Sequence, residues 1–149
     1  MNLKLTNNEF LTLLKIVYLA DYVANGYLDP DKGNQEISAF RRKIFSIAQD
    51  SGFGAVVDID HERDDYFESI EFSFELDKQF VDPHTNRVFW YELRERLTDK
   101  IMDAKFGNEI DSWSGQTYRT RRTEIEEKVQ TELETNGLDN LFILGDFRI

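Results

Sequence analysis

Apolar residues recur at intervals of three and four along most of the chain, the spacing that places them on one face of an α-helix. The first such stretch predicts a helix over residues 7–24. Thr6 and Glu9 form a capping-box pattern at its start, and an Asn-Gly pair ends it. A second amphipathic stretch follows the turn-forming segment 29–34. Two helices are therefore expected in the first third of the chain.

Two further helices are predicted in the second half. Pro83 suits the first turn of a helix, and the apolar stripe after it continues to Gly107. The last helix is expected over about 117–135, with a narrow apolar face and an Asn-Gly pair at its end. The apolar positions expected to be mostly buried in the best of these helices are Leu14, Val17, Phe40, Ile44, Trp90, Leu93 and Leu97.

Residues 69–81 fit two patterns. Apolar and acidic or hydroxyl residues alternate through much of the segment, as in a half-buried strand. The alternative is a helix with Ser69 as its N-cap. The helical face would carry Phe67, Ile70, Phe74 and Val81. The helix is slightly favoured because helices are predicted on both sides.

A short strand is predicted over residues 55–59, which are rich in β-branched side chains. The tail, Leu138–Ile149, is too apolar for a frayed terminus and is expected to dock on the body, as an edge strand beside 55–59. The patterns together predict a mainly α, single-domain helical bundle of about five helices over residues 1–149, with room for this small two-stranded β element.

Three short segments support the same architecture by resemblance. They are Phe89-Trp90-Tyr91-Glu92-Leu93 followed by Arg96-Leu97, Val17-Tyr18-Leu19-Ala20-Asp21, and Asn136-Gly137-Leu138. This combination resembles a set of small uncharacterised bacterial proteins with a Phe-Trp-x-Glu-Leu helix. The resemblance implies one mainly helical domain and implies no activity.

Composition narrows the set of partners. The chain has 18 basic and 29 acidic residues, a net charge of -11, which repels polyanions on average. Nucleic acid and membrane surfaces are therefore not expected as partners. The absence of cysteine excludes disulfides and thiolate chemistry. The apolar segment Phe10–Ala20 is too short to span a bilayer, so a cytoplasmic location is expected.

Motifs for catalysis or metal binding are incomplete. His61-Glu62 begins like the zinc motif in which two histidines lie four residues apart on a helix, but Asp65 stands in place of the second histidine. The carboxylates that alternate after residue 57 resemble the start of a calcium loop. The sixth position of that loop is Arg63 instead of glycine, and the twelfth is Ser69 instead of glutamate. No metal and no other cofactor is therefore predicted.

Charged clusters suggest an interaction surface. Residues 58–82 are strongly acidic, and the start of the last predicted helix is basic, where the helix dipole disfavours positive charge. The two are expected to pair, whereas Arg41, Arg42 and Lys43 are interpreted as the solvent face of the second helix. The predicted surface comprises Asp58, Asp60, Glu62, Asp64, Asp65, Tyr118, Arg119, Arg121 and Arg122.

The function favoured by elimination is that of a small, acidic, non-enzymatic protein that binds another protein or its own copy. One alternative is an acidic decoy that presents carboxylates where a partner expects the phosphates of nucleic acid. The other is an enzyme in which His61 or His84 converges with carboxylates in a cleft without any sequence motif.

Overall fold

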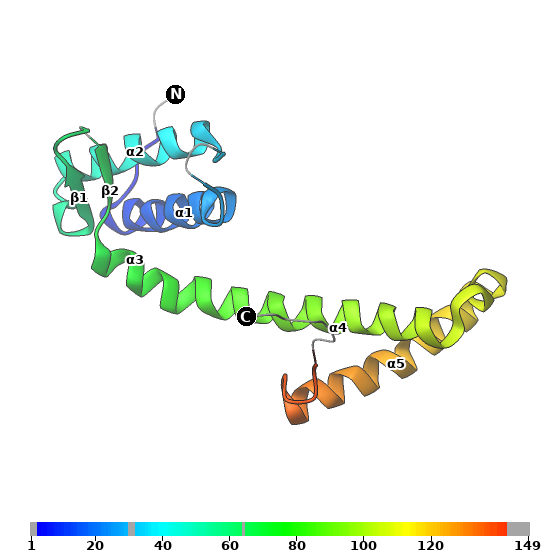
Figure 1. The fold of residues 1–149 in the computed structure, drawn as a ribbon. Helices are drawn as coiled ribbons and strands as arrows, with labels where there is room; N and C mark the ends of the chain where they lie inside the picture. Colours follow the sequence, from blue (N-terminus) through cyan, green and yellow to red (C-terminus); the bar gives the residue numbers. More distant parts are fainter. Residues whose placement is uncertain (1–2, 30–31, 64, 143–149) are drawn as a thin grey trace. The chain divides into compact units, whose positions relative to one another are not determined.

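The computed structural model describes residues 3–29, 32–63 and 65–142. The helices are α1 (Asn7–Asn25), α2 (Gln35–Asp50), α3 (Ile70–Leu76), α4 (Asp82–Phe106) and α5 (Gly115–Asn136). Two strands, β1 (Val57–Asp60) and β2 (Asp65–Glu68), form a hairpin (Figure 1). Shorter helical segments are η1 (Gly54–Val56), η2 (Asp77–Val81) and η3 (Gly107–Ser112). The predicted mainly α class is confirmed.

The chain divides into two compact units, Met1–His84 and Thr85–Ile149. Unit 1 contains α1, α2, the β-hairpin, α3 and η2, while unit 2 contains nearly all of α4 together with η3 and α5. Each unit has hydrophobic clusters formed by its own residues. The organisation of residues 1–149 as a single domain remains a prediction.

The start of α1 follows the predicted capping box. The Thr6 hydroxyl accepts a hydrogen bond from the backbone N–H of Glu9, and the Glu9 carboxylate accepts one from the Thr6 backbone at 2.8 Å. The hydrogen bonds that the Thr6 backbone N–H and the Thr6 hydroxyl donate to the Glu9 carboxylate lower the pKa of Glu9, because they favour its charged form. The predicted first helix, 7–24, is thus confirmed to within one residue.

The strand predicted over residues 55–59 is observed over 57–60, because residues 54–56 form η1, and its observed partner is β2, whereas the tail was predicted. β1 pairs antiparallel with β2, in a register that places Val57 opposite Glu68 and Asp60 opposite Asp65. A hairpin closes a very short loop, whereas pairing with the distant tail would close a long one at a larger entropic cost. Residues 138–142 of the tail are not in a strand, and residues 143–149 lie outside the described residues.

The core of unit 1 lies between α1, α2 and the hairpin. Its buried members are Leu14, Val17, Ile44, Phe45, Ala48 and Val57. Phe40, which was predicted to be buried, is 54% exposed. Phe45, five residues later on the same helix, is fully buried in the core. The apolar stripe of α2 is wider than the surface that α1 and the hairpin cover, so one edge of the stripe remains in solvent.

The helical interpretation of residues 69–81 is correct, including the N-cap, because the Ser69 hydroxyl accepts from the Phe72 backbone at 3.3 Å. The predicted buried face is correct for Val81, which is buried, and wrong for Ile70 and Phe74, which are exposed. Ile70 is 75% exposed, whereas Leu76 and Val81 are buried in a second cluster with Tyr18 of α1. Leu76 and Val81 are five residues apart, a spacing that the π-helical geometry of η2 places on one face.

Unit 2 is a helical hairpin in which α5 follows α4 through η3 (Figure 1). Its cluster is centred on Met102 of α4 and on Ile125, Val129 and Leu133 of α5. The predicted core residues Trp90, Leu93 and Leu97 are half-buried against this cluster. As predicted, an Asn-Gly pair closes α5, and Gly137 has a φ of 57° that favours glycine.

Candidate interaction groove between α1 and α2

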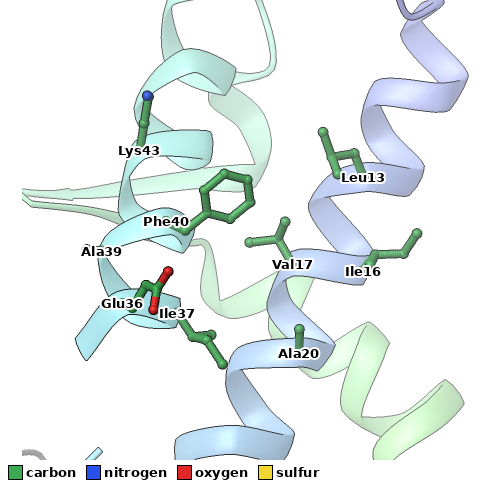
Figure 2. Close-up of a pocket in the computed structure, with 9 residues that line it drawn as sticks. All are labelled: Leu13, Ile16, Val17, Ala20, Glu36, Ile37, Ala39, Phe40 and Lys43. Carbon is green, nitrogen blue, oxygen red and sulfur yellow. The ribbon is translucent and has the colours of Figure 1, made fainter. Parts of the chain in front are cut away.

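An apolar groove of about 610 Å³ lies between α1 and α2, entirely within unit 1. Its lining residues from α1 are Leu13, Ile16, Val17 and Ala20, and those from α2 are Glu36, Ile37, Ala39, Phe40 and Lys43. Figure 2 shows the Phe40 ring extending from α2 toward α1, and Val17 extending from α1 toward α2. The groove is therefore an apolar depression with one acidic and one basic side chain at its edge.

The groove leaves large apolar side chains in solvent. Ile16 is 57% exposed and Phe40 is 54% exposed, although their neighbours Leu14 and Phe45 are fully buried. Ile47 lies seven residues after Phe40 on the same face of α2 and is 42% exposed. Ile16 and Phe40 both line the groove, and exposed apolar side chains gathered in a depression with charged residues at its edge are typical of a binding surface.

Polar contacts fix the end of the groove where α1 meets the start of α2. The Asn25 amide donates to the Asp21 carboxylate at 2.7 Å and to the Ser38 hydroxyl at 3.0 Å. The Ser38 hydroxyl itself donates to Asp21 at 3.0 Å. Asn34 caps α2 by accepting from the backbone of its first turn, and its own N–H donates to the side-chain oxygen of Asn25 at 2.5 Å. These bonds tie the two helices in one geometry.

Arg41 of α2 helps to fix the wall of the groove that this helix forms. Arg41 donates two hydrogen bonds to Glu68 of β2, at 2.9 and 3.2 Å, and a third to Asp21 of α1 at 3.4 Å. Its side chain is only 19% exposed. The interpretation of Arg41 as a solvent-facing residue was therefore wrong, whereas Arg42 and Lys43 beside it are exposed. Arg41 turns α2 so that Phe40 faces the groove.

α1 is held from its other side by Tyr18. The Tyr18 hydroxyl donates to the Asp77 carboxylate of η2 at 2.5 Å, and the ring is 8% exposed. Burial of the ring, together with this hydrogen bond, raises the pKa of Tyr18 well above its usual value. The phenol is neutral throughout the physiological range, and both walls of the groove rest on a rigid scaffold.

The acidic half of the predicted interaction surface lies on the β-hairpin. Asp60 accepts from the backbone N–H of Glu62 at 3.0 Å and so shapes the turn. Asp58 is opposite Phe67 in the register, and Asp65 lies 3.8 Å from Arg42 of α2. Asp64 lies outside the described residues. None of the four described acids lines the α1/α2 groove.

The basic half of the predicted surface lies on α5, in unit 2. Tyr118 is 36% exposed, Arg119 donates to Gln116 at 3.2 Å, and Arg121 donates to Glu124 at 3.1 Å. Residues 58–82, which were predicted to pair with these arginines, belong to unit 1. The acidic partners found for the arginines come from unit 2, so the interaction surface formed by these nine residues remains a prediction.

Arg122 is the most strongly paired of these arginines. It donates to Glu95 at 2.7 Å and to Asp99 at 3.2 Å, both of α4, and to Glu126 at 3.2 Å. The hydrogen bond to Glu95 raises the pKa of Arg122 and lowers the pKa of Glu95. The compensation predicted for positive charge near the start of α5 is thus supplied by the helical hairpin itself.

The two histidines lie in exposed positions, His61 in the turn between β1 and β2, and His84 in the first turn of α4. Over residues 3–29, 32–63 and 65–142, no three histidine or carboxylate side chains are grouped in a way that could hold a metal ion. Within the same ranges, no helix is both long and apolar enough to cross a lipid bilayer.

Comparison with family models, curated proteins and solved structures yields no match to this chain. The groove therefore has to be interpreted from its own chemistry. The sequence does carry a signal for it, because apolar residues recur in the second amphipathic stretch at spacings of three and four, at Ile37, Phe40, Ile44, Ile47 and Ala48. A face of that width exceeds what one neighbouring helix covers.

Proposed function

We propose that this chain is a non-enzymatic binding protein whose α1/α2 groove takes up an apolar segment of a protein partner. The observation that supports the proposal is the exposure of Ile16 and Phe40 beside a fully buried core. Covering either side chain would contribute about 1 kcal/mol, since full burial of such a residue is worth about 1.5 to 3 kcal/mol and each is already partly covered.

The shape of the groove favours a helical ligand. Two helices line it along their length, and an amphipathic helix docks in such a depression with apolar anchors one turn apart. The bonds of Arg41 and Asn25 hold the walls in place before binding, which reduces the ordering cost of association. The net charge of -11 disfavours a nucleic-acid ligand, and we propose a cytoplasmic role with a protein as the partner.

A displayed peptide library tests the groove directly. The full chain is immobilised and used to select from a phage library of short helical peptides, and selected peptides are then measured against two variants. Phe40→Glu places a charge in the groove, whereas Ile70→Glu changes an exposed apolar residue of α3 outside it. We expect peptides with apolar residues at helical spacing whose binding falls at least tenfold for Phe40→Glu and stays unchanged for Ile70→Glu.

Both variants replace exposed side chains, so their free energy of unfolding should match that of the parent within about 1 kcal/mol. Selection of no peptide, or of peptides that bind both variants equally, would contradict a binding role for the groove.

A further inference from the structure

We propose that the groove is occupied by a second copy of this chain, with the two α2 helices antiparallel across a two-fold axis near Phe40. This inference rests on the proposed function, because it names the partner of the same groove. In a two-fold interface the same surface is used by both copies, so the surface must be complementary to itself. That condition is met on α2 by the charged residues Glu36 and Lys43, the small residue Ala39 and the aromatic residue Phe40.

The charged lining residues are complementary to themselves. Glu36 and Lys43 are the two charged residues of the groove, and they are seven residues apart, so both lie on the same face of α2. Phe40 lies between them, about 6 Å along the helix from Glu36 and about 4.5 Å from Lys43 at 1.5 Å per residue. An axis through the midpoint between Ala39 and Phe40 places Glu36 opposite the partner's Lys43, and Lys43 opposite the partner's Glu36.

Other arrangements do not satisfy both charges. Two parallel α2 helices in register would place Glu36 opposite the partner's Glu36. A different helical ligand would need a basic residue, an apolar centre and an acidic residue in that order over two turns. The α2 helix itself, read in the opposite direction, supplies that order. Charge complementarity therefore favours a second copy over an unrelated helix.

The centre of the face allows close approach. Ala39 and Phe40 lie on either side of the midpoint between Glu36 and Lys43, and both line the groove. Ala39 has the small side chain that lets two helices approach to the usual 8 to 10 Å separation. Phe40, which is 54% exposed, can then enter the space between α1 and α2 of the other copy.

The long-range charge opposes association. Each copy carries a net charge of -11, so two copies repel each other. Dissolved salt screens part of this repulsion. The exposed ion pairs add modestly to the apolar contact. A dissociation constant on the order of 10 to 100 μM is expected, as for the smaller class of transient interfaces.

Sedimentation equilibrium of the full chain at physiological salt, from micromolar to millimolar protein, measures the association. Glu36→Lys alone and Lys43→Glu alone each place like charges opposite one another twice, and each should weaken self-association about tenfold. An equimolar mixture of the two variants restores opposite charges at both contacts and should associate like the parent. The variant that carries both substitutions should do the same.

Cross-linking provides a readout that does not depend on charge. The chain has no cysteine, so Ala39→Cys introduces a single thiol beside the proposed axis. Under mild oxidation it should form a covalent dimer, because the two Cα atoms can reach the distance that a disulfide requires. Ile70→Cys, at a 75% exposed site of α3 outside the groove, is the matched control and should remain monomeric.

Thermal unfolding of every variant accompanies these measurements, because Glu36 also lies in the favourable first turn of α2. A parent chain that stays monomeric up to millimolar concentration overturns the two-fold dimer, as would a dimer that forms regardless of the charge at positions 36 and 43. In either case, selected peptides that depend on Phe40 would still support the proposed binding function. A groove covered by another part of its own chain would give a monomer and select no peptide, and would contradict both.

Discussion

Arg41 and Glu68 face each other in a two-point contact, with nitrogen to oxygen distances of 2.9 and 3.2 Å. Their side chains are 19% and 14% exposed, so the pair lies in the partly covered layer between α2 and β2. The guanidinium also reaches Asp21 of α1. One residue of α2 is thus bonded to both of the elements against which that helix packs, and the orientation of the helix depends on it.

Arg41→Ala is expected to destabilise unit 1 by about 2 kcal/mol, since it leaves two partly buried carboxylates without their charged partner. Urea unfolding followed by far-ultraviolet circular dichroism measures the loss. Arg42→Ala is the control, because Arg42 is 45% exposed and lies 3.8 Å from Asp65. It should change the free energy of unfolding by less than about 0.5 kcal/mol. Equal effects from the two substitutions would show that Arg41 has no special structural role.

Two phenylalanines of α2 should differ sharply in their contribution to stability. Phe45→Ala removes a ring with 0% exposure and should cost about 3 to 5 kcal/mol, through lost burial and the cavity left behind. Phe40→Ala removes a ring with 54% exposure and should cost less than about 1 kcal/mol. Chemical denaturation of the two variants tests the ranking. The ranking would be reversed if the face of α2 predicted from the sequence were the buried one.

The difference between Phe40 and Phe45 illustrates which features of the structure can be predicted from the sequence. Helix positions and caps were predictable because Thr6, Ser69 and the Asn-Gly pairs act on neighbouring residues. The buried edge of a wide apolar stripe was not predictable, because it depends on which distant element covers it. For α2 that element is the β-hairpin, which covers the side of Phe45 and leaves Phe40 in solvent.

The remaining differences have equally local causes. Of the face predicted for residues 69–81, Val81 is buried, but its buried neighbour is Leu76 and not Phe74. The π-helical geometry of η2 brings Leu76 and Val81, five residues apart, onto one face, and an apolar period of 3.6 does not anticipate that spacing. The wide apolar face of α2 was visible in the sequence, but the groove itself could not be located from it, since a site of this kind has no motif. It consists of apolar residues that the fold leaves uncovered.

Tyr18→Phe should lower the stability of unit 1 by about 1 to 2 kcal/mol at neutral pH, because the Asp77 carboxylate loses its donor at 2.5 Å. The substitution should also change the response to alkali. The pKa of Tyr18 is raised in the folded state, so its contribution is fully present below the usual tyrosine pKa of about 10 and is lost as the pH rises above it. As the pH is raised from neutral to above 10, the midpoint temperature of thermal unfolding should therefore fall less steeply for Tyr18→Phe than for the parent.

Glu95 should contribute stability with the opposite dependence on pH. The hydrogen bond from Arg122 lowers the pKa of Glu95, so its contribution is present above the usual glutamate pKa of about 4.3 and is lost as the pH falls. Glu95→Gln should lower the free energy of unfolding by about 1 kcal/mol at pH 7. The effect is modest because the side chains of Arg122 and Glu95 are 22% and 24% exposed, so solvent weakens their attraction. In thermal unfolding at a series of pH values, the difference from the parent should disappear in strong acid. Glu92→Gln, at an exposed pair with Arg96, should show almost no difference at any pH.

Thr98→Val is expected to stabilise unit 2. Thr98 has 0% exposure, and its hydroxyl has no hydrogen-bond partner among the residues described. A buried hydroxyl without a partner costs about 1 to 3 kcal/mol, and valine has nearly the same shape, so a gain of about 1 kcal/mol follows. Calorimetry of the full chain would register it as a higher unfolding temperature. A loss of stability would indicate that the hydroxyl is hydrogen-bonded in solution.

The division of the chain between residues 84 and 85 also divides its intrinsic fluorescence. Both tryptophans of the chain, Trp90 and Trp113, belong to unit 2 and pack against its hydrophobic cluster. Unit 1 contains only the weaker tyrosine and phenylalanine chromophores. Tryptophan emission therefore reports the unfolding of the α4/α5 hairpin and does not observe the groove directly. A midpoint from emission that differs from the one seen by circular dichroism would show that the two units unfold separately.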